Sequence, residues 1–177
     1  MSKSTPYDAD RARFSRQALA RLALSDQART VAESAAGLVG TRNDVDTGPG
    51  GRASQAQQLI EHAERCLVTA VVYERERGSS WAEIGAYLGI SAAEASNRYA
   101  TAIQDWNSAF EEPYGPDQNG RMRIPQLPTA AYDPGWACTH LDRWASLNRI
   151  GINDELAVSA GLVMAADPGT PDETSAS

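Results

Sequence analysis

The chain has 177 residues, of which 42% are hydrophobic, and its formal net charge is −7. This length provides for one ordinary globular domain with a buried core. The acidic balance argues against a diffuse nucleic-acid coat, because such binding depends on many Lys and Arg contacts to phosphates. No apolar run reaches the length of a membrane span, and the first residues lack the hydrophobic segment of a secretory signal. We therefore expect a cytoplasmic protein without a membrane partner.

The chemistry-bearing residues are too few and too scattered to indicate an enzyme. Cys66 follows His62 by one helical turn, and Cys138 precedes His140 by two residues, but these spacings match structural zinc sites poorly. Both pairs fall in amphipathic helical patterns where a buried Cys needs no metal. With two histidines, no nucleophile elbow and no pair of carboxylates on a plausible cleft, the sequence predicts no catalytic residue, no metal and no cofactor.

Residues 8–39 contain no proline and are rich in Ala, Leu, Arg and Gln, which predicts one long amphipathic helix within an N-terminal segment 1–39. The apolar stripe of this helix consists of Leu24, Ala28, Val31, Ala35 and Leu38. Such a stripe needs a partner, which is either the central part of the chain or the same helix of a second subunit, and we expect a homodimer. The first half carries four arginines, which either follow a phosphate backbone or form a solvated face. They are Arg11, Arg13, Arg16 and Arg21.

Residues 40–53 concentrate Gly, Asn, Asp and Pro and read as a flexible linker. Ser54, with Gln57 three residues later, then begins a helix that extends to Arg77 and ends at Gly78. This helix opens a predicted domain that spans residues 54–112.

Two further helices are predicted between Gly78 and Tyr99, each with its own start signal. Ser80 precedes Glu83 by three residues and Ser91 precedes Glu94 by three, so each serine can cap a helix in a reciprocal capping box. Between the two boxes, Gly89 can adopt the positive φ that ends the first helix, and Gly85 can let the second helix approach closely. Ile84, Leu88 and Trp81 should be buried beneath the turn.

This stretch resembles the trihelical helix-turn-helix domains of actinobacterial DNA-binding regulators. Their core often reads Gly-x-Ser-Trp-x-Glu-Ile-Gly-x-x-Leu-Gly-Ile/Val-Ser. The matching residues are Gly78, Ser80, Trp81, Glu83, Ile84, Gly85, Leu88, Gly89, Ile90 and Ser91. The resemblance implies a trihelical fold and a second helix that enters the major groove of DNA.

The same resemblance implies which residues would contact DNA. The positions after Ser91, where such domains usually carry long polar side chains, are here Ala92, Ala93, Ser96 and Asn97, followed by Arg98. Ser79 and Ser80 would position the helices on phosphates. Arg75 and Arg77 either contact phosphates beside the motif or simply complement the C-terminal end of their own helix. Arg98 can instead pair with Glu94 one turn back.

The helix that begins at Ala92 continues to Glu112, with an apolar stripe formed by Tyr99, Ile103, Trp106 and Phe110 that suits a core or a dimer interface. A Pro-rich connection follows at residues 113–135. Residues 136–166 predict a C-terminal helical pair, and the acidic residues 167–177 predict a disordered tail.

The predicted fold class is therefore all-α, with a trihelical helix-turn-helix core, a long N-terminal helix and a C-terminal helical pair. The predicted function is a DNA-binding transcriptional regulator that acts on double-stranded DNA as a dimer. The alternative is a protein-interaction module, of mobile-element or phage type, in which the alanine-rich helix packs against a partner protein.

Overall fold

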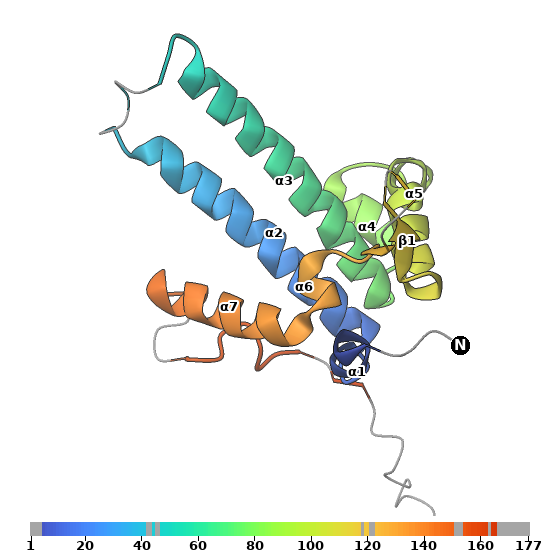
Figure 1. Ribbon diagram of the computed structural model, residues 1–177. Coiled ribbons are helices and arrows are strands. Elements are labelled where there is room, and N and C mark those ends of the chain that lie inside the picture. Colours follow the sequence, from blue (N-terminus) through green and yellow to red (C-terminus); the bar gives the residue numbers. More distant parts are fainter. Residues whose placement is uncertain are drawn as a thin grey trace, which may run out of the picture.

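A computed structural model of the chain describes residues 5–41, 44, 47–117, 119–120, 123–150, 154–162 and 164–165. Helices dominate this part of the chain, as predicted (Figure 1). The structure differs from the predicted all-α class by one antiparallel pair of short strands. The elements are α1 (Pro6–Arg11), α2 (Arg16–Val39), α3 (Gly51–Glu76), α4 (Trp81–Leu88), α5 (Ala92–Glu111), β1 (Tyr114–Pro116), β2 (Arg123–Pro125), α6 (Thr129–Tyr132) and α7 (Pro134–Leu147).

The prediction of a single helix over residues 8–39 is wrong, because the chain turns between α1 and α2. Thr5 and Asp8 form a capping box that starts α1, and the Ser15 side chain accepts a hydrogen bond from the Ala18 amide to start α2. Between the two helices, Phe14 pairs as an isolated bridge with Met164 near the other end of the described chain. The break is therefore stabilised by a local cap and by a contact with a segment that is distant in sequence.

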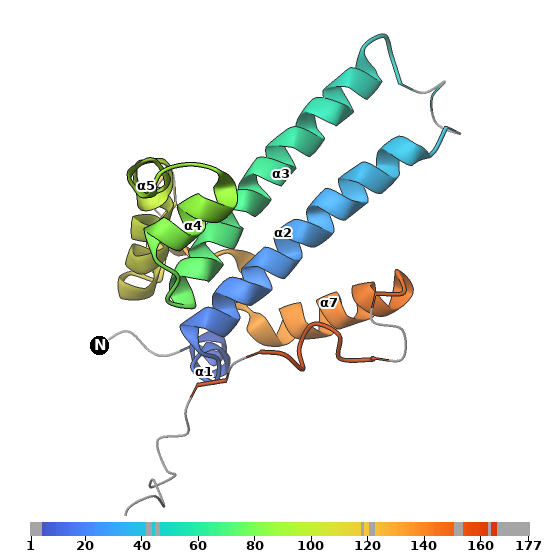
Figure 2. The same ribbon diagram turned by 180° about the vertical axis from the view of Figure 1, so that it is seen from behind.

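Helices α2 and α3 lie side by side as a long pair (Figures 1 and 2). The helix α3 starts at Gly51 instead of Ser54, after Gly50 with a φ of 83°. The Arg52 guanidinium holds this end, because it pairs with Asp44 and donates to the carbonyl oxygens of Gly37 and Gly40. Gly40 and Asp44 of the predicted linker are thus bonded through Arg52 to the start of α3.

The partner of the predicted α2 stripe is α3 of the same chain. Leu24, Val31 and Leu38 are half-buried, as expected for a two-helix pair with solvent on its outer sides. The second stripe, on α5, also has its partners within the chain, since Tyr99 and Trp106 are buried. The two stripes from which the sequence predicted a homodimer are therefore used inside the monomer.

The hydrophobic core is centred on the first half of α2. Leu19 and Leu22 are 2% and 0% exposed. Leu19 packs in one cluster with Val72 and Trp106, and Leu22 packs in a second cluster with Leu141. Small neighbours complete both clusters and let α6 and α7 come close to α2. They are Ala20, Ala109, Ala130, Ala131 and Ala137.

The carboxylate of Glu76 joins α2, α3 and α5. Its Oε1 atom accepts from the Trp106 indole Nε1 at 2.9 Å and from Arg16 Nη2 at 2.7 Å. The Arg16 guanidinium also lies 4.3 Å from the centre of the Phe110 ring. Arg16 is therefore committed to holding the helices together.

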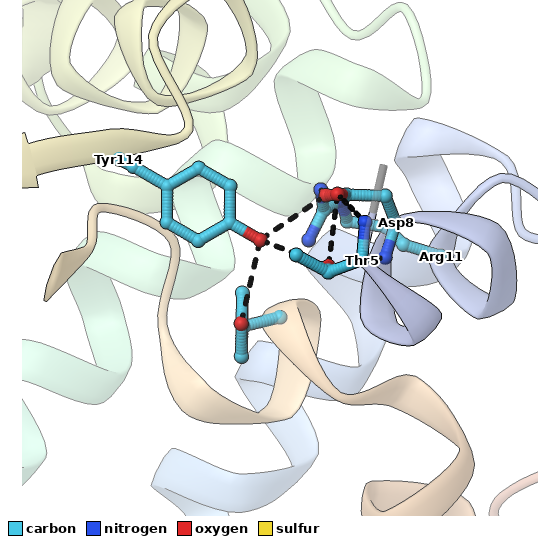
Figure 3. Close-up of polar contacts among 5 residues, drawn as sticks. Thr5, Asp8, Arg11 and Tyr114 are labelled. Atoms are coloured by element: carbon cyan, nitrogen blue, oxygen red, sulfur yellow. Dashed lines mark hydrogen bonds and ion pairs between the residues drawn. The ribbon is translucent and has the colours of Figure 1, made fainter. Parts of the chain in front are cut away.

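Within the described part of the Pro-rich segment 113–135, polar side chains form a cluster around Tyr114 on β1 (Figure 3). The Tyr114 hydroxyl donates to Asp8 Oδ1 at 3.2 Å and lies 3.1 Å from Thr5 Oγ1. Asp8 in turn forms an ion pair with Arg11, whose side chain is only 11% exposed. The pKa of Tyr132 is raised to about 12, first by its hydrogen bond with Tyr114 and second by burial. This cluster joins α1, the strand pair and α6.

The prediction of two C-terminal helices is correct only for the first of them. Helix α7 forms, with the Asp133 side chain accepting from the Trp136 amide at its start. The described residues 154–162 of the predicted second helix form turns instead. The buried Asp142 on α7 anchors them, because its Oδ1 accepts from the amides of Val158 (2.8 Å) and Ser159 (3.1 Å). The predicted disordered tail 167–177 lies outside the described residues.

Asp142→Ala is expected to lower the free energy of unfolding by about 1–2 kcal/mol, because two amides lose a charged acceptor. Urea unfolding measures the change. Asp142→Asn is the matched control, since its carbonyl oxygen still accepts from both amides. Equal losses in the two variants would show that the segment is not held through these bonds.

Candidate nucleic-acid interface

Helices α4 and α5 form where the capping signals predict them. At α4, the Glu83 amide donates to Ser80 Oγ at 3.2 Å, and the Ser80 amide donates to Glu83 Oε2 at 2.7 Å, which confirms the capping box. At α5, the Glu94 amide donates to Ser91 Oγ at 3.1 Å. The return bond predicted for Glu94 is replaced by an ion pair with Arg98 at 3.0 Å.

The turn between the helices depends on two glycines. Gly89 ends α4 with a φ of 70°, in the left-handed region that residues with a Cβ avoid. Gly85 lies against the backbone of the turn, because a Cβ atom at this position would stand 2.7 Å from the Ile90 carbonyl oxygen. The prediction of a close approach at Gly85 is confirmed.

Beneath the turn, α3, α4 and α5 share one apolar cluster of Val71, Ile84 and Tyr99, each 6% exposed or less. Trp81 and Leu88 pack against it from α4. The Arg75 guanidinium lies 4.7 Å from the centre of the Trp81 ring, and its Nη1 atom donates to the Ser79 carbonyl oxygen. Arg75 is therefore occupied within the protein, and its predicted role as a phosphate contact finds no support in this geometry.

The other predicted contact residues divide into two groups. Ser79 and Ser80 are engaged locally, since the Ser79 hydroxyl donates to Glu74 at 2.9 Å and the Ser80 hydroxyl to Glu83 at 2.7 Å. On the first two turns of α5, Ala92, Ala93, Asn97 and Arg98 are exposed and Ser96 is half-buried.

The arginines nearest the turn are paired but still reach solvent. The side chain of Arg98 is 55% exposed, and that of Arg77, which pairs with Glu74 at 3.0 Å, is 49% exposed. Exposed pairs of this kind stabilise a protein by about 0–1 kcal/mol. Either guanidinium can therefore turn to a phosphate at small cost.

The structure brings Arg21 on α2 together with Arg77. The two guanidinium groups lie 5.8 and 5.4 Å from the centre of the same ring, that of Tyr73 on α3. Local sequence holds no signal for this meeting, because the two arginines belong to different helices. Of the other N-terminal arginines, Arg11 is half-buried and pairs with Asp8, Arg16 is bound to Glu76, and Arg13 is 71% exposed.

The outer face of α5 becomes acidic toward its C-terminal half, where Asp105, Glu111 and Glu112 are exposed. Asp105 follows Ala92 by thirteen residues, which places it about 20 Å farther along the helix. These three carboxylates lie beyond the two turns that carry Asn97 and Arg98, where the exposed Glu94 pairs with Arg98.

An apolar groove of about 580 Å³ lies between α3 and α4, beside the turn. Its walls include Leu67, Val71, Ile84 and Leu88, with Glu74 and Glu83 among the polar residues of its lining. Tyr87 borders it with 94% of its surface exposed. Hydrophobic periodicity could not predict this groove, because it does not show which apolar residues remain uncovered.

In the part of the chain that the structure describes, no three His, Cys, Asp or Glu side chains gather in a way that suits a metal ion. The described helices also include none with the length and apolar character needed to cross a bilayer. Comparisons with protein-family models, curated proteins and solved structures found no match to this chain.

Proposed function

We propose that this chain is a cytoplasmic DNA-binding transcriptional regulator in which α3, α4 and α5 act as a trihelical helix-turn-helix unit. The observation that carries the proposal is the α4–α5 turn. The cap formed by Ser80, the positive φ of Gly89 and the close approach at Gly85 leave one face of the first two turns of α5 exposed. Helix-turn-helix proteins insert the corresponding helix into the major groove, with its N-terminal residues at base edges.

In this proposal, Asn97 and Arg98 read bases. An amide side chain can bind adenine through two hydrogen bonds, and a guanidinium can bind guanine in the same way. Ala92 and Ala93 allow the helix to approach closely and can contact thymine methyl groups. Ser80 fixes the start of α4, whose free amides favour a phosphate.

The remaining affinity comes from arginines outside α5. Arg21 and Arg77 already lie together around Tyr73, and both are exposed. They form the cationic pair best placed to contact phosphates beside the turn. Because each arginine that contacts a phosphate releases counterions from the DNA, binding should weaken as the salt concentration rises. Two subunits would read two half-sites about one helical turn apart.

The test is an anisotropy titration of the full chain with duplexes selected from a random library, at low and at physiological salt. Arg98→Ala or Asn97→Ala should cost about 1–3 kcal/mol on the selected sequence and reduce its preference over random DNA. Arg77→Ala and Arg21→Ala should weaken all sequences alike and each flatten the salt slope by about 1. Arg65→Ala is the control, because Arg65 is exposed on α3 and is absent from both proposed contact sets.

A second candidate function, a protein-interaction module, is favoured by the apolar groove between α3 and α4 and by the alanines that open α5. Small side chains allow a partner helix to pack closely. If the full chain binds no duplex at low salt, while a stoichiometric protein partner is recovered and lost on Ala93→Arg, this candidate replaces the regulator.

A further inference from the structure

Two exposed surfaces of the chain have complementary character. The first is the groove face, formed by Leu67 on α3, by Tyr87 on α4 and by the groove between them. Leu67 is 40% exposed and Tyr87 94% exposed, so both offer apolar surface to a partner. Glu74 and Glu83 line the groove, and the exposed Glu64 lies one turn before Leu67. Arg77 is the one cation in the lining, and Glu74 already pairs with it.

The second surface is the outer face of α7, formed by Trp136, His140, Arg143 and Leu147. Their spacing of four, three and four residues places them on one side of the helix. Trp136 is 47% exposed and Leu147 is 74% exposed. The Trp136 ring stacks on the His140 imidazole, with 4.7 Å between centroids and 8° between planes. Within the described residues, no carboxylate pairs with Arg143.

The α7 face therefore has apolar anchors around Arg143, with which no described carboxylate pairs, and the groove face has an apolar floor with carboxylates. Tryptophan, tyrosine and arginine are also the residues that dominate binding energy at protein interfaces. We propose that the α7 face of one copy of this chain docks into the groove face of a second copy. Leu147 and Trp136 supply apolar contacts along the groove, and Arg143 pairs with Glu74 or Glu83.

The two faces do not meet within one molecule. Helix α7 packs against α1, α2 and α6, whereas α4 packs against α5 (Figures 1 and 2). The apolar stripes of α2 and α5 pack within the chain, which leaves Leu24, Val31 and Leu38 half-buried and buries Tyr99 and Trp106. A contact between two different faces is either reciprocated in a closed dimer or repeated along a ring or an open chain.

Sedimentation velocity and light scattering from micromolar to several hundred micromolar, without DNA, test the proposal. The wild-type chain should associate as its concentration rises. Tyr87→Arg, which puts a cation in the groove face, and Leu147→Glu, which puts an anion in the α7 face, should each weaken association by about tenfold or more. Val39→Glu is the matched control, since Val39 is 80% exposed and belongs to neither face.

A mixing experiment separates this arrangement from any contact between like faces. The Tyr87→Arg variant retains an intact α7 face, and the Leu147→Glu variant retains an intact groove face. Each should be monomeric alone, and an equimolar mixture of the two, with one carrying a larger tag, should form heterodimers. Circular dichroism of both variants should match wild type, because the changed side chains are exposed.

A wild-type chain that stays monomeric at every concentration overturns the proposal. So does association that survives either substitution, or a mixture that fails to form heterodimers. The measurement contains no nucleic acid, so its outcome is independent of whether the chain binds DNA.

Discussion

Truncation of Leu22 to alanine is expected to lower the free energy of unfolding by about 2–5 kcal/mol. The Leu22 side chain has no exposed surface and packs with Ala130, Ala137 and Leu141, which belong to α6 and α7. Its loss removes the apolar contacts and leaves a cavity where three helices meet, and the small alanines around it cannot fill the space. For a domain of this size, such a loss is a large part of the total stability.

Leu24→Ala is the matched control for Leu22→Ala. Both leucines lie on α2, so the two substitutions change helix propensity alike, but Leu24 is only half-buried against α3. Urea unfolding monitored by circular dichroism should give a clearly smaller loss for Leu24. Equal losses, or a larger one for Leu24, would place the centre of the core along the predicted α2 stripe and contradict the packing described here.

Gly85→Ala is expected to destabilise the chain by up to about 3 kcal/mol, although alanine normally favours helices. A Cβ atom at residue 85 would stand 2.7 Å from the Ile90 carbonyl oxygen and 3.1 Å from the Ser91 carbonyl carbon. These are backbone atoms, so the α4–α5 turn itself would have to move. Because this turn sets the direction of α5, we also expect the Gly85→Ala variant to lose any duplex binding even under conditions in which it stays folded.

Gly37→Ala is the control, because Gly37 is also helical and no atom within 4 Å would meet its Cβ. Alanine there should stabilise the chain by roughly 0.5–1 kcal/mol through its lower backbone entropy in the unfolded state. Thermal melting of the two variants should therefore shift in opposite directions. A shift of Gly85→Ala toward higher temperature would show that the two helices do not approach closely at this glycine.

The features of the candidate site that could be predicted from the sequence are those set by neighbouring residues. A serine three residues before a glutamate predicts the start of α4, and Gly89 predicts its end. The exposure of Asn97 and Arg98 follows equally from their places on α5. These predictions depend on interactions within a few residues, which the order of side chains specifies directly.

Local sequence could not predict which arginines are bound within the protein and which face solvent. Arg16 binds Glu76 across 60 positions of sequence, and Arg21 lies near the Tyr73 ring only because α2 and α3 lie side by side. A local pattern shows that a cation is present and says nothing of whether a distant carboxylate or ring receives it. The predicted phosphate contacts therefore separate into internal and exposed residues only once the helices are packed.

By itself, the sequence determined the helical class and the α4–α5 turn with its caps and glycines, because these follow from backbone conformation and helical periodicity. Only the tertiary structure decided the break before α2, the centring of the core on Ala18–Ala23, the strand pair and the turns held by Asp142. Alanine is only weakly hydrophobic, so a helix face that is buried because its side chains are small does not stand out in the sequence. The free energy of such contacts depends on which distant surfaces fit together, and that is a property of the packed chain.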